Sequence, residues 1–326
     1  MSETKKIRVA VNGAGRIGRT FVKLALTHSD IDMVAVNDLG DVENMAYLLK
    51  YDTVYGVNRS SIFVSADKKS IVIDGKNILC LSQKDPAALP WKDLAIDVVV
   101  ESTGFFTSYE KARLHITAGA KRVVISAPAK SDGQESCTIL MGINEEKLKS
   151  CDVTSNASCT TNAGSPVIAI LDETLGIEKA LLNTVHAYTA TQSLVDAPGS
   201  RDFRNGRAAA QNIIPASTGA AVSTTEAITN LKGLFDGIAI RVPVVAGSIV
   251  DVTFVSKKQT TAKEVNDILK KAAGEARWKG IFAVTEEPVV SSDILGSPYA
   301  SIADLALTRV VGGNLVKVLA WYDNEM

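Results

Sequence analysis

The sequence predicts a two-domain α/β protein with a doubly wound parallel sheet in the first domain and a mostly antiparallel sheet in an α+β second domain. Its 326 residues are too many for one average domain and sufficient for two. Short β-branched runs alternate with helical patterns over the first 158 residues, which favours a parallel sheet. After residue 159 the strands are longer and alternate apolar with polar residues. We therefore place the domains at 1–158 and 159–322, with 323–326 expected to return to the first.

The first domain is expected to form continuous apolar strands, which are typical of parallel sheets covered on both faces. These strands are predicted at Ile7–Val11, Met33–Val36, Ser61–Val64, Ile71–Ile73, Ile96–Val100, Val123–Ile125 and Thr138–Met141. Between them, apolar residues recur at helical spacing over Arg16–Thr27 and Val42–Leu49.

The second domain is expected to form longer strands with few helices between them. The strands are predicted at Leu181–His186, Gly237–Val245, Ile249–Ser256, Ile302–Val311 and Leu315–Tyr322. Helical patterns cover Gly164–Leu175, Gly219–Asn230 and Ala262–Ala273. A few helices that back a mostly antiparallel sheet define an α+β domain.

Charge and hydropathy exclude several classes of function. Thirty-five basic residues against 36 acidic ones give a net charge of −1, so we expect no nucleic-acid partner. The opening hexapeptide MSETKK lacks the apolar segment of a signal peptide. The longest weakly charged stretch, Ala208–Thr225, contains Gln, Asn and Pro and cannot cross a bilayer. The sequence therefore predicts a cytoplasmic protein with no membrane partner.

The cysteines and histidines predict reduced thiols and no metal site. The chain has four cysteines, Cys80, Cys137, Cys151 and Cys159, and without a secretion signal they are expected to be reduced. Cys80 and Cys137 lie in apolar, strand-like surroundings and are interpreted as buried inert thiols. With no CxxC pair and three histidines, a zinc site is not expected.

A glycine-rich turn follows the first strand. Asn12 to Gly18 reads NGAGRIG, between a predicted strand and a predicted helix. In this position Gly13 permits the tight turn, Gly15 lets the backbone approach a pyrophosphate, and Gly18 lets the helix pack on the strand. Asp38 follows the second strand, 20 residues after Gly18, where a carboxylate accepts the ribose hydroxyls and repels a 2′-phosphate. The sequence therefore predicts a Rossmann domain that binds NAD in preference to NADP.

Cys159 is the candidate nucleophile. It lies in SNASCTTN, where the first domain ends and a helical pattern begins, and a helix N-terminus favours the thiolate. His186 closes a strand in the same domain, and a protonated His186 nearby would lower the thiol pKa and then act as acid and base. Two alternatives remain. Cys159 would be a structural cysteine, which is the more common role of a lone cysteine, and His186 would be a histidine of the core.

Eight collinear segments resemble phosphorylating glyceraldehyde-3-phosphate dehydrogenase of the bacterial type. They are NGAGRIGR (12–19), STGFF (102–106), ISAPAK (125–130), NASCTTN (156–162), HAYTATQ (186–192), NIIPASTGAA (212–221), RVP (241–243) and WYDNE (321–325). The combination of NASCTTN with HAYT, in this order, is highly specific. The resemblance covers nearly the whole chain and implies a cytoplasmic homotetramer.

The resemblance implies a role for each matching residue. Cys159 would add to the aldehyde of D-glyceraldehyde 3-phosphate, and His186 would remove the proton as hydride passes to NAD. Inorganic phosphate would then attack the thioester and release 1,3-bisphosphoglycerate. The implied site for inorganic phosphate comprises Ser158, Thr160, Thr218, Gly219 and Arg207, and the substrate-phosphate site Thr189 and Arg241. The implied cofactor residues are Asn12, Gly13, Gly15, Arg16, Ile17, Gly18, Asp38, Ser102, Thr103, Gly104, Ser126 and Asn324, the last for the nicotinamide carboxamide.

Some departures from the family pattern leave alternatives open. Ala197-Pro198 replaces the Leu-Pro of several strictly NAD-specific members, which leaves an opening for NADP. The family continues beyond the position of Met326 into a helix that packs on the dinucleotide domain. A related enzyme that oxidises erythrose 4-phosphate to the free acid would share the Cys/His pair. A protein that binds RNA or a protein partner in the dinucleotide crevice, and a Cys-His hydrolase, are the alternatives from other classes.

Overall fold

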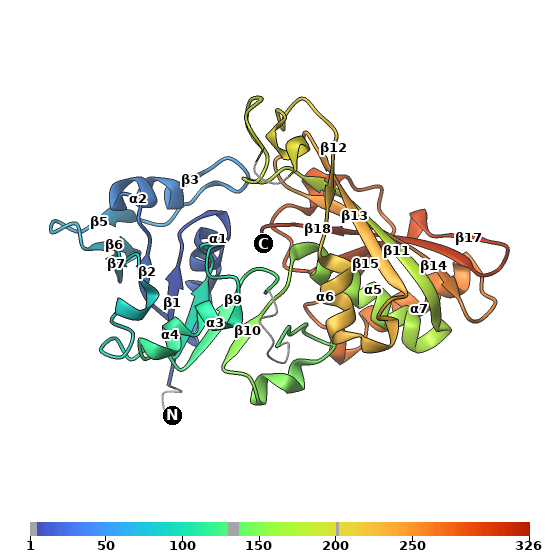
Figure 1. The fold of residues 1–326 in the computed structure, drawn as a ribbon, viewed down its shortest axis with the longest axis horizontal. Helices are drawn as coiled ribbons and strands as arrows, with labels where there is room; N and C mark the ends of the chain where they lie inside the picture. The colour runs from blue at the N-terminus through green and yellow to red at the C-terminus, as the bar shows by residue number, and fades with distance from the viewer. Residues whose placement is uncertain (1–4, 130–136, 200–201) are drawn as a thin grey trace. The chain divides into compact units, whose positions relative to one another are not determined.

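The computed structural model describes residues 5–129, 137–199 and 202–326. They form two compact units (Figure 1). The N-terminal unit contains the residues up to 139 and 146–156, and the C-terminal unit contains 140–145 and 157–326. Each unit is built on its own eight-stranded sheet.

The sheet of the N-terminal unit is parallel at its centre. Its strands, in spatial order, are β10 (Val153–Ser155), β9 (Arg122–Ile125), β8 (Val98–Glu101), β1 (Ile7–Asn12), β2 (Ile31–Asn37), β7 (Lys76–Leu81), β6 (Ser70–Ile73) and β5 (Ile62–Val64). All neighbours from β10 to β7 are parallel, whereas β7, β6 and β5 form an antiparallel edge. The chain passes from β1 to β2 on one side and later to β8 on the other. The strand order therefore reverses beside β1, which is the position where doubly wound sheets bind ligands.

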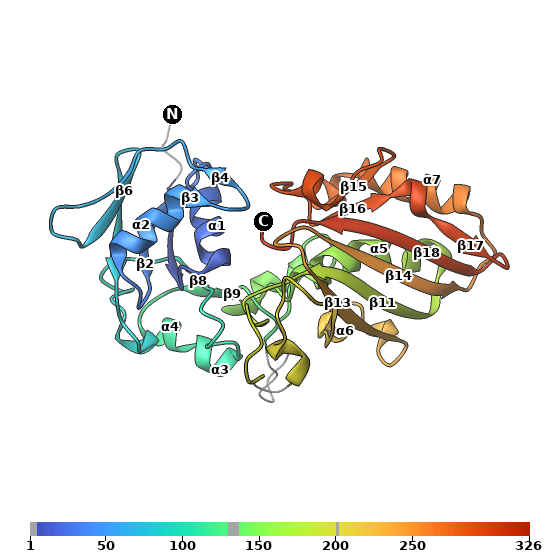
Figure 2. The same ribbon diagram turned by 90° about the horizontal axis from the view of Figure 1, so that it is seen from above.

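Apolar side chains on both faces of β1 explain why this strand contributes to two hydrophobic cores. Val9 and Val11 pack with residues of α1 (Arg16–Ala25) and α2 (Val42–Lys50). Ala10, on the other face, packs with Leu89 and Trp91. Figure 2 shows α1 and α2 on one side of the strands and α3 (Tyr109–Ala112) and α4 (Leu114–Thr117) on the other. A small separate sheet pairs β3 (Tyr51–Asp52) with β4 (Gly56–Val57).

The sheet of the C-terminal unit is mostly antiparallel. Its path is β12 (Ile214–Ser217), β13 (Phe235–Val242), β11 (Ile177–Ala187), β14 (Ser248–Ser256), β18 (Leu315–Tyr322), β16 (Ser301–Asp304) and β15 (Phe282–Thr285), and β17 (Arg309–Val311) also pairs with β18. Two pairs are parallel, β11 with β13 and β15 with β16. The predicted fold class, a doubly wound domain followed by an α+β domain, is confirmed.

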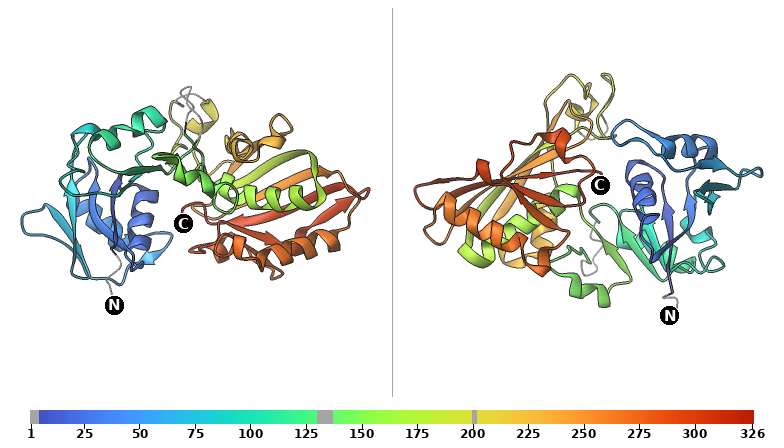
Figure 3. Two further views of the ribbon diagram at one scale, coloured as in Figure 1. Left: turned by 90° about the horizontal axis from the view of Figure 1, so that it is seen from below. Right: turned by 180° about the vertical axis from the view of Figure 1, so that it is seen from behind.

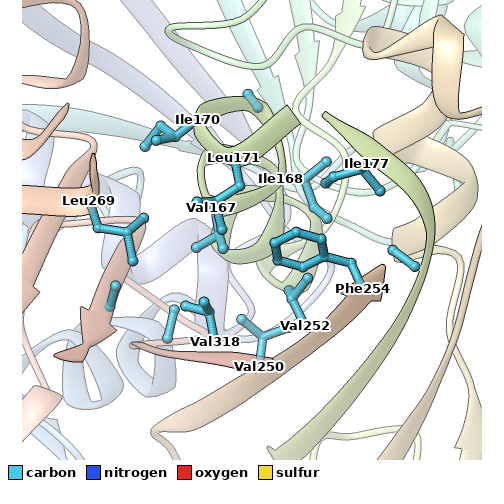
Figure 4. Close-up of a cluster of buried hydrophobic side chains, with 14 of the residues drawn as sticks. Val167, Ile168, Ile170, Leu171, Ile177, Val250, Val252, Phe254, Leu269 and Val318 are labelled. Atoms are coloured by element: carbon cyan, nitrogen blue, oxygen red, sulfur yellow. The ribbon is translucent and has the colours of Figure 1, made fainter. Parts of the chain in front are cut away.

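Alternation along β14 builds the main core of this unit. Val250, Val252 and Phe254 are buried, and they pack against Val167 and Leu171 of helix α5 (Figure 4). Helices α5 (Cys159–Leu175), α6 (Ala220–Ala227) and α7 (Ala262–Ala273) supply the rest of the cover (Figure 3). Short 3-10 turns occur at Pro86–Ala88, Glu145–Lys149, Phe203–Gly206, Thr229–Leu231, Ala276–Trp278, Ser291–Ile294 and Leu305–Leu307.

Several sequence-based boundaries were wrong for local physical reasons. Helix α5 begins at Cys159 and not near 164, because Ser158 caps it by accepting a hydrogen bond from the Thr161 amide. The expected strand 302–311 is interrupted by a 3-10 turn over Leu305–Leu307. Within 138–141, only an isolated bridge from Thr138 to Ser155 forms.

The expectation of four reduced cysteines was also wrong for this structure. Cys137 and Cys151 form a disulfide whose Cα atoms lie 6.2 Å apart. Cys137 was interpreted as an inert thiol from its apolar flanks. The Ser155 amide donates to the Cys137 carbonyl, however, and this pairing places Cys137 beside β10, which begins two residues after Cys151. Cys80 and Cys159 are free.

Candidate active site

The turn from β1 into α1 has the geometry that its glycines predict. Gly13 has a φ of +99°, and a Cβ there would lie 2.7 Å from the Thr103 nitrogen. A Cβ at Gly18 would lie 1.9 Å from the Gly13 carbonyl oxygen. At Gly15, the N-cap of α1, a Cβ would meet nothing within 4 Å, so this side of the turn is open. A glycine N-cap leaves the first helical N–H groups available to a pyrophosphate.

A cavity of about 830 Å³ lies at the carboxyl ends of β1, β2, β7 and β8. Its lining residues are Asn12, Gly13, Gly15, Asn37, Asp38, Leu39, Gln83, Lys84, Asp85, Pro86, Ser102, Thr103, Phe105, Phe106 and Leu114. Six of these were predicted from the sequence. Gln83, Lys84, Asp85 and Pro86 were not, because they follow β7, a strand that the sequence had not predicted. Its size and its mixture of apolar walls with glycine backbone suit a dinucleotide.

Asp38 is held by the two turns beside this cavity. Its Oδ2 accepts a hydrogen bond from the Ala14 amide at 2.7 Å, and its Oδ1 accepts one from the Gly40 amide at 2.8 Å. Each carboxylate oxygen has two acceptor positions, so one on each oxygen remains for a ribose hydroxyl. The residues present therefore fit the adenosine ribose of NAD.

The other predicted cofactor residues are distributed around the turns and in the C-terminal unit. Arg16 and Ile17 open α1, and Arg16 pairs with Asp52 at 2.9 Å. Gly104 follows Thr103 with a φ of +77°. Ser126 Oγ donates to the Glu101 carbonyl at 3.1 Å, whereas Lys130, at the end of the same motif, lies outside the described residues.

Asn324 lies in the C-terminal unit. Its Oδ1 accepts hydrogen bonds from the Gly247 amide at 2.9 Å and from Ser248 Oγ at 3.1 Å. These two bonds fix the orientation of the side-chain amide, because the oxygen must face the two donors. The amide nitrogen is then the group that remains to bind a ligand.

Cys159 and His186 are brought together, as the sequence predicted. Cys159 is the first residue of α5, and His186 is the penultimate residue of β11. Their Sγ and Nε2 atoms lie 3.3 Å apart, which is hydrogen-bond distance for a sulfur. Ala157, two residues before Cys159, has a φ of +54°, an uncommon conformation for a residue with a Cβ. The chain thus turns sharply into the helix that presents the thiol.

Arg241 completes the cluster from the neighbouring strand. It is the register partner of His186 in the pair β11–β13, and its Nη1 lies 2.6 Å from His186 Nδ1. The same Nδ1 lies 2.6 Å from the Ala187 carbonyl oxygen. A guanidinium only donates, so the first contact suits the Nε2–H tautomer and the second suits the Nδ1–H tautomer. Only the Nδ1–H tautomer leaves Nε2 free to accept a proton from Cys159.

Burial decides the charges of this pair. Burial, together with the nearby charge of Arg241, lowers the pKa of His186 to about 4. Burial also raises the pKa of the Cys159 thiol, which outweighs the lowering by hydrogen bonds from Thr160 and by Arg241. These directions favour a neutral pair, with His186 as a free base, over the protonated His186 and thiolate expected from the sequence.

The sequence analysis missed Tyr322, which is buried behind the pair. Its hydroxyl lies 2.8 Å from Thr160 Oγ1 and 2.8 Å from Thr184 Oγ1, and its ring meets that of His186 edge to face. Burial raises its pKa, so the hydroxyl stays protonated. Tyr322 lies in the matching segment WYDNE, but its own position, an aromatic residue at the end of an apolar strand, is typical of a core residue.

The predicted phosphate-binding residues fall into three groups. Ser158, Thr160 and Arg241 surround Cys159, and the buried Arg241 Nε finds no hydrogen-bond partner among the described residues. Thr189 and Arg207 lie in the long segment after β11, where Thr189 Oγ1 contacts Thr191 and Arg207 pairs with Asp196 at 3.0 Å.

Thr218 and Gly219 lie at the start of α6. Thr218 Oγ1 accepts the Ala220 amide at 3.1 Å, and Gly219 is the N-cap. A Cβ at Gly219 would meet nothing within 4 Å, so the helix N-terminus is open.

A dinucleotide-binding unit and a thiol–imidazole pair on one chain are typical of NAD-dependent dehydrogenases that oxidise aldehydes through a cysteine. Comparison with known proteins identifies the family within this class. Residues 7–109 match the NAD binding domain of glyceraldehyde 3-phosphate dehydrogenase, and residues 158–324 match its C-terminal domain.

Full-length relatives agree with these domain matches. The chain is 50% identical over 322 residues to a glyceraldehyde-3-phosphate dehydrogenase of Streptomyces coelicolor, which covers 98% of this chain and 94% of the relative. It is 47% identical to one of Geobacillus stearothermophilus and 46% identical to glyceraldehyde-3-phosphate dehydrogenase 1 of Bacillus subtilis, with the same coverage.

The chain belongs to the glyceraldehyde-3-phosphate dehydrogenase family. It is an NAD-dependent oxidoreductase, which confirms the predicted enzyme class and the predicted cofactor. Among the described residues, no helix is both long and apolar enough to span a bilayer. The same residues contain no group of three or more His, Cys, Asp or Glu side chains that could hold a metal ion.

Proposed function

We propose that this chain oxidises D-glyceraldehyde 3-phosphate with NAD and inorganic phosphate to give 1,3-bisphosphoglycerate. The observation that carries the proposal is the 3.3 Å contact between Cys159 Sγ and His186 Nε2 at the N-terminus of α5. The relatives named above support the substrate, since their names specify glyceraldehyde 3-phosphate. NAD and phosphorylated trioses are cytoplasmic metabolites, so we propose that the enzyme acts in the cytoplasm.

The neutral Cys159–His186 pair starts the reaction. The sulfur forms a bond to the aldehyde carbon while Nε2 of His186 accepts the thiol proton and returns it to the aldehyde oxygen, which gives a hemithioacetal. When bound, NAD accepts the hydride from this carbon. As the carbon–hydrogen bond breaks, Nε2 removes the hydroxyl proton, and a thioester on Cys159 results. His186 must use the Nδ1–H tautomer, in which Nδ1 donates to the Ala187 carbonyl 2.6 Å away.

Arg241 supports this tautomer when it binds the substrate phosphate together with Thr189. Its Nε is buried without a hydrogen-bond partner among the described residues, and a buried unpaired donor requires an acceptor from a ligand. A guanidinium that turns to a phosphate gives up its contact with His186 Nδ1. When substrate is bound, His186 Nδ1 would therefore donate to the Ala187 carbonyl only, and Nε2 would accept a hydrogen bond from the Cys159 thiol.

Inorganic phosphate then attacks the thioester carbon, and the carbon–sulfur bond breaks. The sulfur leaves as a thiolate and regains its proton from His186. Ser158 and Thr160 flank Cys159, and Thr218 and Gly219 open α6, so hydroxyl and N–H donors are available to this anion. Arg207, which forms an exposed pair with Asp196, supplies the positive charge of the proposed site.

We also propose that the chain forms a homotetramer. Leu181 in β11, Ile238 in β13 and Leu315 in β18 are 65%, 55% and 43% exposed. The strand registers place all three on the same face of the sheet. An exposed sheet face that carries several large apolar side chains is typical of a subunit interface. Sedimentation velocity tests this: Leu181→Asp should shift the tetramer to smaller species, whereas Val57→Asp, at an exposed valine of the N-terminal unit, should not.

Steady-state assays of NADH formation test the reaction. We expect sustained turnover from D-glyceraldehyde 3-phosphate and NAD only when inorganic phosphate is present. Cys159→Ser should abolish it, and Cys80→Ser, at the other free cysteine, serves as the matched control that keeps it. Phosphate-independent turnover, or turnover with erythrose 4-phosphate only, would replace the proposal with a hydrolytic aldehyde dehydrogenase.

A further inference from the structure

A buried polar cluster lies below the dinucleotide cavity and has no part in the chemistry described above. Glu101 ends β8, His115 belongs to α4, and Asn12 ends β1. Glu101 is 1% exposed, His115 0% and Asn12 2%. A carboxylate this deeply buried is stable only when it is fully hydrogen-bonded.

All four acceptor positions of the Glu101 carboxylate are occupied. Oε1 accepts the Thr103 amide at 2.8 Å and the Thr103 hydroxyl at 2.5 Å. Oε2 accepts Asn12 Nδ2 at 2.6 Å and contacts His115 Nε2 at 3.1 Å. Two oxygens offer about four lone-pair positions, so no position remains for a proton. The hydrogen bonds therefore require an ionised Glu101.

Trp91 sets the tautomer of His115. The indole Nε1–H donates to His115 Nδ1 at 2.9 Å, and an indole nitrogen is only a donor. Nδ1 must therefore be the unprotonated nitrogen, and the ring proton lies on Nε2, where it faces Glu101. His115 is a neutral donor in this arrangement, and the cluster carries the single negative charge of Glu101.

The Glu101 carboxylate connects the turn after β1 with the turn after β8, and both turns line the cavity. Through Asn12 it holds the end of β1, and through Thr103 it holds the loop after β8. Ser102 Oγ adds a second cross-link by donating to the Gly13 carbonyl at 2.7 Å. The backbones of Gly13 and Thr103 also approach closely, since a Cβ at Gly13 would lie 2.7 Å from the Thr103 nitrogen, so displacement of Thr103 toward this turn would displace Gly13.

We propose that Glu101 is a positioning residue for NAD: its buried carboxylate, held by Thr103, Asn12 and His115, sets the spacing of the two turns that form the pyrophosphate side of the cavity. The proposal rests on this cavity as the NAD site. Both donors of Thr103 are used by Glu101, so Thr103 contributes its position to the cavity and no donor to the cofactor.

Glu101→Gln is the decisive variant. A glutamine side chain has an NH₂ group in place of one carboxylate oxygen. This NH₂ group would face either the two donors of Thr103 or the donors of Asn12 and His115. Two donor–donor contacts force the turns apart, and each lost charged hydrogen bond corresponds to about a tenfold change or more. We expect the dissociation constant and the KM for NAD to rise at least about tenfold, with kcat and the KM for glyceraldehyde 3-phosphate within about threefold of wild type.

The experiment combines isothermal titration of the full chain with NAD, steady-state kinetics and the Tm without cofactor. Titration of the wild type comes first, and failure to bind NAD there would refute the proposed function and not the role of Glu101. Glu146→Gln, at an exposed glutamate of the same unit, is the control for loss of one negative charge and should bind NAD as wild type does.

Two results would overturn the proposal. The first is a folded Glu101→Gln variant that binds NAD within twofold of wild type. The second is equal losses in kcat, both KM values and Tm, which would make Glu101 a general structural residue. If Glu101→Gln does not fold, the proposal is tested by comparing Thr103→Val with Thr103→Ser. The valine variant lacks the hydroxyl that donates to Glu101 and the serine variant keeps it, so Thr103→Val should lose more NAD affinity than Thr103→Ser. Equal affinities in these two variants would also overturn the proposal.

Discussion

Replacement of Asp38 by asparagine should relax the preference for NAD over NADP. Asp38 places one carboxylate oxygen on the Ala14 amide and the other on the Gly40 amide, beside the cavity. We expect its remaining acceptor positions to face the ribose whose 2′ substituent distinguishes the two cofactors. The side chain therefore attracts two hydroxyls in NAD and repels the 2′-phosphate in NADP.

The magnitude follows from Coulomb's law. A carboxylate and a single negative charge about 4 Å apart repel by about 1 kcal/mol in bulk water and by about 4 kcal/mol at an effective dielectric constant of 20. A 2′-phosphate near pH 7 carries close to two charges, so the repulsion is at least about 2 kcal/mol, or about thirtyfold in affinity. Asparagine removes this charge and keeps only one of the two acceptor oxygens. The affinity for NAD should therefore fall by up to about tenfold.

The assay measures kcat/KM for NAD and for NADP with the wild type and Asp38→Asn. We expect the ratio of the two values to shift toward NADP by at least about thirtyfold. Asp41→Asn is the matched control, because Asp41 is an exposed residue three positions later whose side chain caps α2, and asparagine caps helices equally well. Its ratio should stay at the wild-type value.

An unchanged ratio in a folded Asp38→Asn variant would show that the charge of Asp38 does not set the cofactor preference. An equal shift of the ratio in Asp41→Asn would show that the preference arises from the general charge of this region. A large loss of NAD affinity without any gain for NADP would show that asparagine disrupts the turn. In that case the two backbone hydrogen bonds, and not the charge, are the main contribution of Asp38.

Three further predictions concern stability and the glycine turn. The disulfide Cys137–Cys151 closes a loop of 14 residues, so its reduction should lower the free energy of unfolding by about 3 kcal/mol in urea titrations; the double serine variant should not respond to dithiothreitol. Gly18→Ala should weaken NAD binding at least about tenfold in titrations, since its Cβ would lie 1.9 Å from a carbonyl oxygen. Burial raises the pKa of Asp52, but backbone hydrogen bonds and Arg16 outweigh it and lower the pKa to about 2. Asp52→Asn should therefore lower stability above about pH 4, and its difference from wild type should vanish as the pH falls toward 2.

The sequence was sufficient where function depends on local backbone geometry. The turn from Gly13 to Gly18 was predicted because a tight strand–helix connection with close backbone contacts excludes side chains at these positions. Cys159 was predicted because its segment, SNASCTTN, lies where the first domain ends and a helical pattern begins, and α5 does begin at Cys159. Both are features of a few consecutive residues, and short-range rules describe them well.

The sequence was insufficient where a property depends on burial or on strand pairing. The charges of Cys159 and His186 depend on desolvation, which no local pattern reports. Tyr322 is 162 residues from Thr160, and only the sheet brings their hydroxyls together. The disulfide between Cys137 and Cys151 was missed for a similar reason, because pairing of the chain near Ser155 decides which thiols meet.

Asp38 and Glu101 show how one residue type performs two tasks at the same edge of a sheet. Both carboxylates follow or end a parallel strand, and both accept backbone hydrogen bonds. Asp38 keeps acceptor positions that face the cavity, so its charge acts on the ligand. Glu101 is 1% exposed and has every position filled by protein donors, so its charge acts on the turns. Substitutions at Asp38 should therefore change the selectivity between NAD and NADP. Substitutions at Glu101 should instead weaken the binding of NAD and NADP to the same extent.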